Sequence, residues 1–321
     1  MIYKFRYSLI LLFSIIAFLP AIDKTCQRNL GKTQLNVQQD FGYYDVNRIA
    51  NDFSNNGMFV TNIKSGKSGM EWPKFMDTDI NYVSGIWIGD STASGIRVTA
   101  AEFASEYSPG SYDSEYNQLK HKVYTINKFD FDSPRSNPDF VNWPVENGAP
   151  WIDNNNDGIY NINDGDSPEM IGDQMHWYVC NDAVQENHSV FHSTPMDIEL
   201  QVTTWGYNGS YSGQSLQDVM FVKTLIINKG QSNIENAYIG LWSDPDLGNA
   251  NDDFVGCDTT LNLGYCYNDG ADAQYGENTP AHGIALLQGP IIESVGNIAN
   301  SFGRTIDGYK NLPMTSFVKY T

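Results

Sequence analysis

The sequence predicts an all-β protein: a β-sandwich of immunoglobulin-like or jelly-roll-like type, with long Asp/Asn-rich loops and little helix. Three observations support this fold class. Glycine and aromatic residues are abundant, with Gly 28, Tyr 19, Phe 16 and Trp 7. Short apolar runs alternate with Gly, Asn and Asp clusters, as strands alternate with turns. No stretch of the chain shows a convincing amphipathic helical period.

The first half of the chain contains three expected strands. Residues 82–89 and 96–104 are rich in β-branched and aromatic side chains, and residues 90–95 between them have the composition of a turn. A third strand is expected at 121–127. Residues 130–150 combine prolines with Asp and Asn, which predicts a loop.

The second half gives the clearest strand pattern. In residues 197–205 apolar side chains recur at every second position, which is typical of a half-buried strand. Residues 218–228 are apolar on both faces, as a central strand would be. Further strands are expected at 237–242, 261–267 and 283–288.

Three segments are expected along the chain. Residues 1–21 have a basic start, an apolar run and a Pro-Ala site, which together indicate a signal peptide. Residues 22–185 form a β-rich region, and residues 186–321 a β-sandwich domain that we expect to be truncated, because residues 317–321 resemble the middle of a strand. Export makes disulfides possible, and Cys257 and Cys266 are close enough in sequence to close a short loop.

The charge of the chain limits its partners. Lys+Arg is 19 and Asp+Glu is 38, giving a formal net charge of −19. Nucleic acid is excluded as an expected partner because phosphate binding needs clustered basic residues. No membrane span is expected after removal of the signal peptide, and cations are the favoured small partners.

A twelve-residue loop at 153–164 has the pattern of a calcium site. Oxygen-bearing side chains recur at alternate positions before a glycine, Gly158, which permits a sharp turn. The expected calcium ligands are Asp153, Asn155, Asp157, the carbonyl of Ile159, Asn161 and Asp164. Aspartate at the last position departs from the glutamate of an EF-hand and fits a loop without flanking helices. The alternative is a soluble loop of Asx-turns.

A second acidic segment follows the strand expected at 237–242. Its candidate cation ligands are Asp244, Asp246, Asp252 and Asp253. Carboxylates gathered without a basic partner repel one another unless a cation or solvent screens them. A solvated loop is the equally weighted alternative.

Catalytic patterns are present only in fragments. His188 and His192 have zinc-protease spacing, but serine replaces the glutamate that would act as the base. Gly89-Asp90-Ser91 resembles the nucleophile block of GDSL hydrolases. Asp173 and His176 match the Asp-His pair of that family, in the wrong chain order. The adjacent Asp252 and Asp253 are a poor glycosidase pair. We therefore expect no catalytic residues.

Several phrases together resemble a known group. They are Gly85-Ile86-Trp87-Ile88-Gly89, residues 96–103, Trp143-Pro144 with Gly148-Ala149-Pro150, the loop beginning at Asp153, Gly172-Asp173-Gln174, and residues 241–248. They resemble the N-terminal region of large secreted proteins exported by the type IX secretion system. The resemblance spans about residues 40–321 and implies a secreted, β-rich chain. The C-terminal sorting domain of that group is absent from this sequence.

These observations lead to one functional expectation and one alternative. The chain is expected to be a secreted, calcium-binding, non-catalytic protein of the cell surface or medium that acts in adhesion or contacts matrix, a surface protein or an extracellular glycan. The alternative is an accessory region of a secreted hydrolase, a glycosidase or peptidase, whose catalytic module lies outside this chain.

Overall fold

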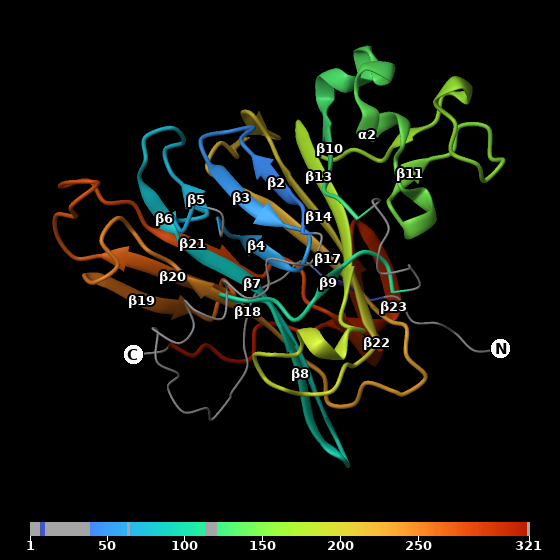
Figure 1. The fold of residues 1–321 in the computed structure, drawn as a ribbon. Coiled ribbons are helices and arrows are strands. Elements are labelled where there is room, and N and C mark those ends of the chain that lie inside the picture. The colour runs from blue at the N-terminus through green and yellow to red at the C-terminus, as the bar shows by residue number, and fades with distance from the viewer. Residues whose placement is uncertain (1–6, 10–38, 63–64, 113–120, 320–321) are drawn as a thin grey trace.

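The computed structural model describes residues 7–9, 39–62, 65–112 and 121–319 (Figure 1). Of the expected signal peptide it describes only β1 (Tyr7–Leu9), which pairs antiparallel with β17 (Phe221–Asn228). The rest of residues 1–21 lies outside the described residues, as does Cys26. All strand pairs in the structure are antiparallel, and strands dominate the fold, so the all-β prediction is confirmed.

The larger sheet has the strand order β18-β7-β4-β3-β5-β6, with β2 on β3 and β8 on β7. Its strands are β2 (Phe41–Tyr44), β3 (Ala50–Ser54), β4 (Met58–Val60), β5 (Met70–Glu71), β6 (Asp79–Asn81), β7 (Val83–Thr92), β8 (Gly95–Ala100) and β18 (Tyr238–Asp244). The expected strands 82–89, 96–104 and 237–242 therefore belong to one sheet.

The second sheet has the order β1-β17-β14-β13-β10, with β9 on β13. Its other strands are β9 (Ser108–Pro109), β10 (Tyr124–Asn127), β13 (Gln174–Asn181) and β14 (Ile198–Gly206). The strands expected at 121–127, 197–205 and 218–228 are all present. The sequence pattern did not predict β13, because it indicated only that these residues belong to an acidic region.

Smaller sheets and short helices surround these two sheets. The sheets are β11 (Trp151–Ile152) with β12 (Ser167–Pro168), β15 (Ser210–Tyr211) with β16 (Gln214–Ser215), β19 (Asp253–Asp258) with β20 (Leu263–Asn268) and β21 (His282–Ala285), and β22 (Ile291–Ser301) with β23 (Arg304–Asn311). The helices are η1 (Lys128–Asp132), η2 (Pro134–Ser136), α2 (Pro138–Val141), η3 (Val145–Asn147), η4 (Ile162–Asp164) and η5 (Gln185–Asn187). The loop expected at 130–150 thus contains short helical turns.

Strand β13 separates two hydrophobic cores. Successive side chains of a strand point to opposite faces. Tyr178 and Cys180 belong to the core between the two large sheets, whereas Met175, Trp177 and Val179 belong to a second core. This second core lies under the α2 and β11 region, shown in green in Figure 1. All eight residues of β13 are buried for this reason.

The two large sheets each combine strands from both halves of the chain. β18 pairs with β7, and β13 pairs with β14 over its whole length. The core between the sheets is formed by side chains from both halves of the chain, of which Tyr44 is the first and Leu286 the last in sequence. The segments 22–185 and 186–321, which were expected as separate regions, therefore share both sheets and one core.

Two further expectations differ from the structure. Cys257 lies opposite Gly264, and Cys266 lies opposite Val255, on neighbouring strands. Both are free thiols, as is Cys180, so the loop-closing disulfide that the spacing of Cys257 and Cys266 would allow is not formed. Residues 312–319 contain no strand, although their last part was expected to be one. Among the described residues, no helix is long and apolar enough to cross a membrane.

Candidate cation-binding site

The predicted calcium loop is closed at its base by a short β-ribbon. Trp151 pairs with Pro168 and Ile152 with Ser167, so β11 and β12 hold the two ends of residues 153–166 together. We call this segment the 153–166 loop. It extends from the second core, at the edge of the molecule (Figure 1). Its shape is therefore set locally, by its own side chains.

Asp153 organises the first turn of the 153–166 loop. Its Oδ1 accepts the N–H of Asp157 at 3.2 Å, and its Oδ2 accepts the N–H of Gly158 at 2.9 Å. Asn155 Oδ1 also accepts the N–H of Asp157, at 3.1 Å. Asn156 and Gly158 have φ angles of 60° and 78°. Such left-handed residues let the turn fold back on itself, which places the side chains at 153, 155 and 157 together.

The remaining predicted ligands form a separate group. Asn161 caps η4, and its Nδ2 donates to Asp164 Oδ2 at 2.5 Å. Ile159 is 67% exposed, and its backbone N–H donates to Asp157 Oδ1 at 2.8 Å. The structure therefore brings Asp153, Asn155 and Asp157 together, and separately joins Asn161 to Asp164.

Asp166 links the two groups and was not among the predicted site residues. Its side chain is buried, with Oδ1 accepting the N–H of Asn154 at 2.9 Å and Oδ2 accepting the N–H of Asn161 at 2.8 Å. Hydrogen bonds to a carboxylate are about twice as strong as neutral ones. The only sequence signal was the position of Asp166 just after the twelve-residue pattern, in front of Ser167-Pro168.

Aromatic side chains fix the loop to the second core. The Tyr160 hydroxyl donates to the carbonyl of Phe140 at 2.6 Å, and its ring packs edge-on against Trp151 with centroids 5.7 Å apart. Burial raises the pKa of Tyr160, with the Asp166 carboxylate adding to the effect. The loop is thus a rigid attachment to the sandwich.

The electrostatics of the 153–166 loop are acidic. Residues 151–182 include no lysine or arginine. Arg135, from η2, reaches the loop but donates to the amide oxygen of Asn163, so it does not neutralise a carboxylate. Within the described residues, no three His, Cys, Asp or Glu side chains form a ready-made metal centre. Any calcium site here therefore depends on amide and carbonyl oxygens as well as carboxylates.

The second acidic segment is organised by two carboxylates at its ends. Asp253 Oδ2 accepts the N–H of Leu247 at 2.9 Å, and Asp272 Oδ2 accepts the N–H of Asn249 at 2.9 Å. Asp272 is 5% exposed and also accepts the N–H of Gln274. Asp272 was not predicted as part of this cluster, because it lies beyond strand β20 in the sequence.

Two carboxylate oxygens in this cluster are shielded from solvent. Within the described structure, Asp252 Oδ1 and Asp253 Oδ1 are buried atoms without a hydrogen-bond partner. Burial raises the pKa of Asp253 to about 6, and the carboxylates of Asp252 and Asp272 contribute to the rise. Asp246 and Asp253 both raise the pKa of Cys266, in addition to its burial. Three of the four predicted residues are therefore neighbours here.

Asp244, the fourth predicted residue of this segment, is placed by sheet pairing. It ends β18 opposite Val83, and its carbonyl accepts the N–H of Tyr82 at 2.9 Å. The structure thus gives its backbone a role in the larger sheet.

The two histidines with zinc-protease spacing do not share a helix face. His188 is buried, and its Nε2 donates to the carbonyl of Asp182 at 2.8 Å. His192 is exposed and has a φ of 54°. The helix between β13 and β14 is only the single turn η5, which ends before His188.

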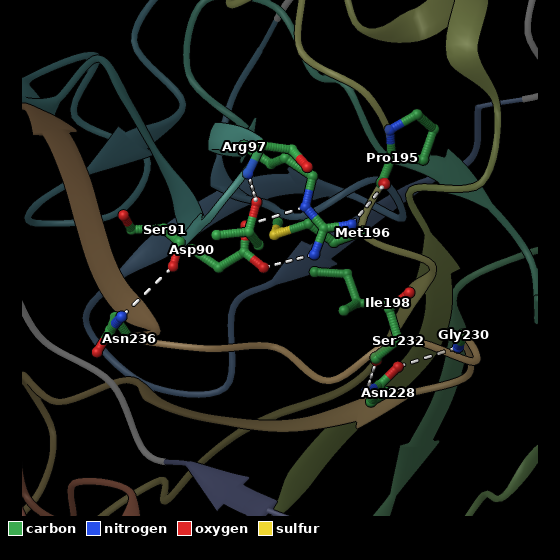
Figure 2. Close-up of polar contacts among 12 residues, drawn as sticks. Asp90, Ser91, Arg97, Pro195, Met196, Ile198, Asn228, Gly230, Ser232 and Asn236 are labelled. Carbon is green, nitrogen blue, oxygen red and sulfur yellow. Dashed lines mark hydrogen bonds and ion pairs between the residues drawn. The ribbon is translucent and has the colours of Figure 1, made fainter.

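The residues that resemble a hydrolase block have structural partners. Asp90 is buried in β7 and forms an ion pair with Arg97 of β8, and the carbonyl of Ser91 accepts from Asn236 at 3.4 Å (Figure 2). His176 is fully buried, and its Nδ1 shares a hydrogen bond with the Thr125 hydroxyl. Asp173 pairs with Lys128 on the surface.

A group of buried carboxylates was missed by the sequence reasoning. Glu106 is fully buried and accepts the N–H groups of Val190 and Phe191, each at 2.9 Å. Glu102 is 8% exposed, and burial together with the Glu106 carboxylate raises the pKa of Glu102 to about 7. Glu106 thus positions the segment that connects β13 to β14.

Comparisons with protein-family models, with curated proteins and with solved structures find no match to this chain.

Proposed function

We propose that this chain is a secreted, calcium-binding β-sandwich protein without catalytic activity of its own, which contacts adhesion partners, matrix or glycans at the cell surface or in the medium. The calcium ion would be held in the 153–166 loop. Its role would be structural: it neutralises the carboxylates of Asp153 and Asp157 and links the first turn of the loop to Asn161 and Asp164.

One observation carries this proposal. Both carboxylate oxygens of Asp153 accept backbone N–H groups from the turn at Asp157 and Gly158, while the loop ends are held by the β11–β12 ribbon. Calcium takes six to eight oxygen ligands and tolerates variation in their geometry. The 153–166 loop has such oxygens at positions from which they could coordinate one calcium ion. Residues 151–182 include no lysine or arginine that would compete with the ion for the carboxylates.

Thermal unfolding tests the calcium site. The protein is measured in calcium and in excess chelator, and so is the variant Asp153→Asn with Asp157→Asn. Binding to the folded state raises the melting temperature by mass action, so we expect calcium to stabilise the native chain and not the variant. The control is Asp132→Asn with Asp307→Asn, which removes the same charge from exposed positions elsewhere. An equal calcium response in the 153/157 variant would disprove the loop assignment.

We include a second cation site at Asp246, Asp252 and Asp253 in this proposal, with Asp244 beside them. The shielded oxygens of Asp252 and Asp253 support it, because adjacent carboxylates that each have one buried oxygen without a hydrogen-bond partner are costly in the absence of a positive partner. Isothermal titration with calcium separates the two sites. The Asp252→Asn, Asp253→Asn variant should lose one binding event and keep that of the 153–166 loop. If it keeps both, the second site is absent.

The cellular location is part of the same proposal. It is supported by the composition of residues 1–21 and by the resemblance to proteins exported through the type IX secretion system. Fractionation of cells that express the full gene, with and without that secretion system, tests it. Protein in the medium or at the outer surface only when the system is present is the expected result. Retention in both strains would refute the export route.

A further inference from the structure

The outer face of the β19–β20–β21 sheet has a continuous row of aromatic side chains. Phe254 of β19 lies opposite Tyr267 of β20, and their rings are stacked with centroids 5.7 Å apart. Tyr265 lies two residues before Tyr267 on the same face, with ring centroids 6.0 Å apart. Phe254 is 50% exposed and Tyr267 is 41% exposed. We call these three residues the aromatic face.

Gly256 lets the aromatic face reach the edge of the sheet. It lies opposite Tyr265, and a Cβ at this position would come within 2.6 Å of the Tyr265 ring and its hydroxyl. The end of the phenol therefore lies over Gly256 on β19, which is between Phe254 and Asp258 in the strand. Because side chains alternate along a strand, Phe254, Gly256 and Asp258 share this face. A ligand that arrives at β19 meets an aromatic ring, a phenol and a carboxylate in order.

Strand β19 is the outer strand of its sheet. In the described part of the chain it pairs only with β20, whereas β20 has partners on both sides. Figure 1 shows this small sheet away from the green cap that carries the 153–166 loop. An outer strand presents backbone N–H and C=O groups that an extended peptide can pair with. The aromatic face and this backbone edge lie together.

Charge complementarity identifies the partner. Between Lys229 and Arg304 the sequence has no lysine or arginine. The charged side chains of this segment are therefore all aspartates and glutamates. Aromatic faces attract cations, and arginine stacks on tyrosine and phenylalanine rings while it pairs with carboxylates. An acidic or phosphorylated ligand would be repelled. The surface therefore fits a ligand with positive side chains on an extended backbone.

We propose that β19 and the aromatic face bind an extended, arginine-containing segment of a partner protein. The segment adds as a strand along β19, and its cationic side chains lie over Phe254 and Tyr267 and reach Asp258. This inference does not depend on calcium in the 153–166 loop, because the two surfaces belong to different sheets.

Fluorescence anisotropy with a labelled peptide of alternating arginine and threonine tests the proposal. The peptide should bind the native chain, and the Phe254→Ala, Tyr267→Ala variant should bind it about tenfold more weakly. Asp258→Asn should also weaken binding. Tyr211→Ala and Asp307→Asn remove an exposed aromatic ring and an exposed carboxylate elsewhere, and should leave binding unchanged. Phe254→Leu keeps an apolar side chain without a ring, and serves if the double alanine variant does not fold.

Two further peptides separate the partner classes. A glutamate-threonine peptide should not bind, and an arginine-threonine peptide with N-methylated backbone amides should bind weakly because it cannot add to β19. The proposal would be overturned if the glutamate-threonine peptide bound as tightly as the arginine-threonine peptide. It would also be overturned if the Asp307→Asn control weakened peptide binding as much as Asp258→Asn does. Binding of a neutral oligosaccharide that depends on Phe254, without binding of the basic peptide, would identify a glycan surface instead. The Asp153→Asn, Asp157→Asn variant should bind the arginine-threonine peptide as tightly as the native chain does, so failure of the proposed calcium site in the 153–166 loop would remain distinguishable from failure of the peptide proposal.

Discussion

Arg97 binds both carboxylate oxygens of Asp90 across neighbouring strands: Nε donates to Oδ1 at 3.0 Å and Nη2 to Oδ2 at 2.5 Å (Figure 2). The two residues are direct partners in the register of β7 and β8. Nη1 of Arg97 also donates to the carbonyl of Pro195 at 3.3 Å. The ion pair therefore connects the β7–β8 hairpin to the segment that enters β14.

Loss of the Asp90 carboxylate is expected to destabilise the protein strongly. Asp90 is 1% exposed, and its removal leaves the guanidinium half-buried without its partner. We expect Asp90→Ala to lower the free energy of unfolding by about 3 kcal/mol, measured by urea unfolding. The exposed Lys67–Asp77 pair is the control, and Asp77→Ala should cost less than about 1 kcal/mol. Equal losses for the two variants would contradict the expected effect of burial.

Glu102 gives the stability of the protein a definite pH dependence. Its pKa is raised to about 7, so the folded state holds a proton that the unfolded state releases near the ordinary glutamate value of 4.5. Stability should therefore fall as pH rises through this window. Glu102→Gln should remove that loss and raise the free energy of unfolding at about pH 8 by about 3 kcal/mol. Glu146→Gln, on an exposed side chain, is the matched control. If the free energy of unfolding of Glu102→Gln fell more steeply with rising pH than that of the native chain, the expected direction of the Glu102 effect would be wrong.

His176 should act in the opposite direction. It is fully buried between the rings of Tyr44 and Phe53, and burial lowers the pKa of His176 to about 3. As pH decreases, the unfolded state takes up the proton before the folded state does. The contribution of His176 to stability therefore falls below about pH 6.5. The nuclear magnetic resonance signal of the imidazole should not titrate between about pH 8 and about pH 5. A midpoint near 6.5 would place the ring in solvent.

Asp166 is expected to hold the 153–166 loop even without a cation. Its two oxygens accept the N–H groups of Asn154 and Asn161. In excess chelator, Asp166→Ala should lower the free energy of unfolding by about 2 kcal/mol and speed hydrogen exchange at these two amides. Asp132→Ala, an exposed aspartate outside the loop, should change neither. If exchange at Asn154 and Asn161 is unchanged in Asp166→Ala, the buried carboxylate does not order the loop.

The strands that the sequence predicted well are those with a local signal. In β14 the apolar side chains alternate, and β17 is mostly apolar on both faces, so both are recognisable within a short window. β13 was missed although all eight of its residues are buried. Its neighbours in the sequence are acidic, and its two faces are buried by different groups of residues: one by the core between the large sheets, the other by the second core, which includes side chains from residues 124–149.

The site was predicted in part for a similar reason. Asp153, Asn155 and Asp157 follow a regular spacing that is visible in the sequence, and the structure places them on one turn. Asp166 and Asp272 have no such spacing. They are recognisable only by the backbone N–H groups that converge on them, from Asn154 and Asn161 in one case and Asn249 in the other. The division expected near residue 185 does not separate the two segments, because strand pairs such as β18 with β7 cross it, and such long-range pairing has no local sequence signal.

The pairing of β18 with β7 has a consequence for how the chain matures. Residues 83–89 have their outer neighbour at 238–244, so the larger sheet stays unfinished until the ribosome has synthesised residue 244, more than 150 residues later. Long-range strand pairing of this kind makes folding slow. The nascent chain therefore carries an open sheet edge for much of its synthesis, which gives chaperones an extended period in which to bind it.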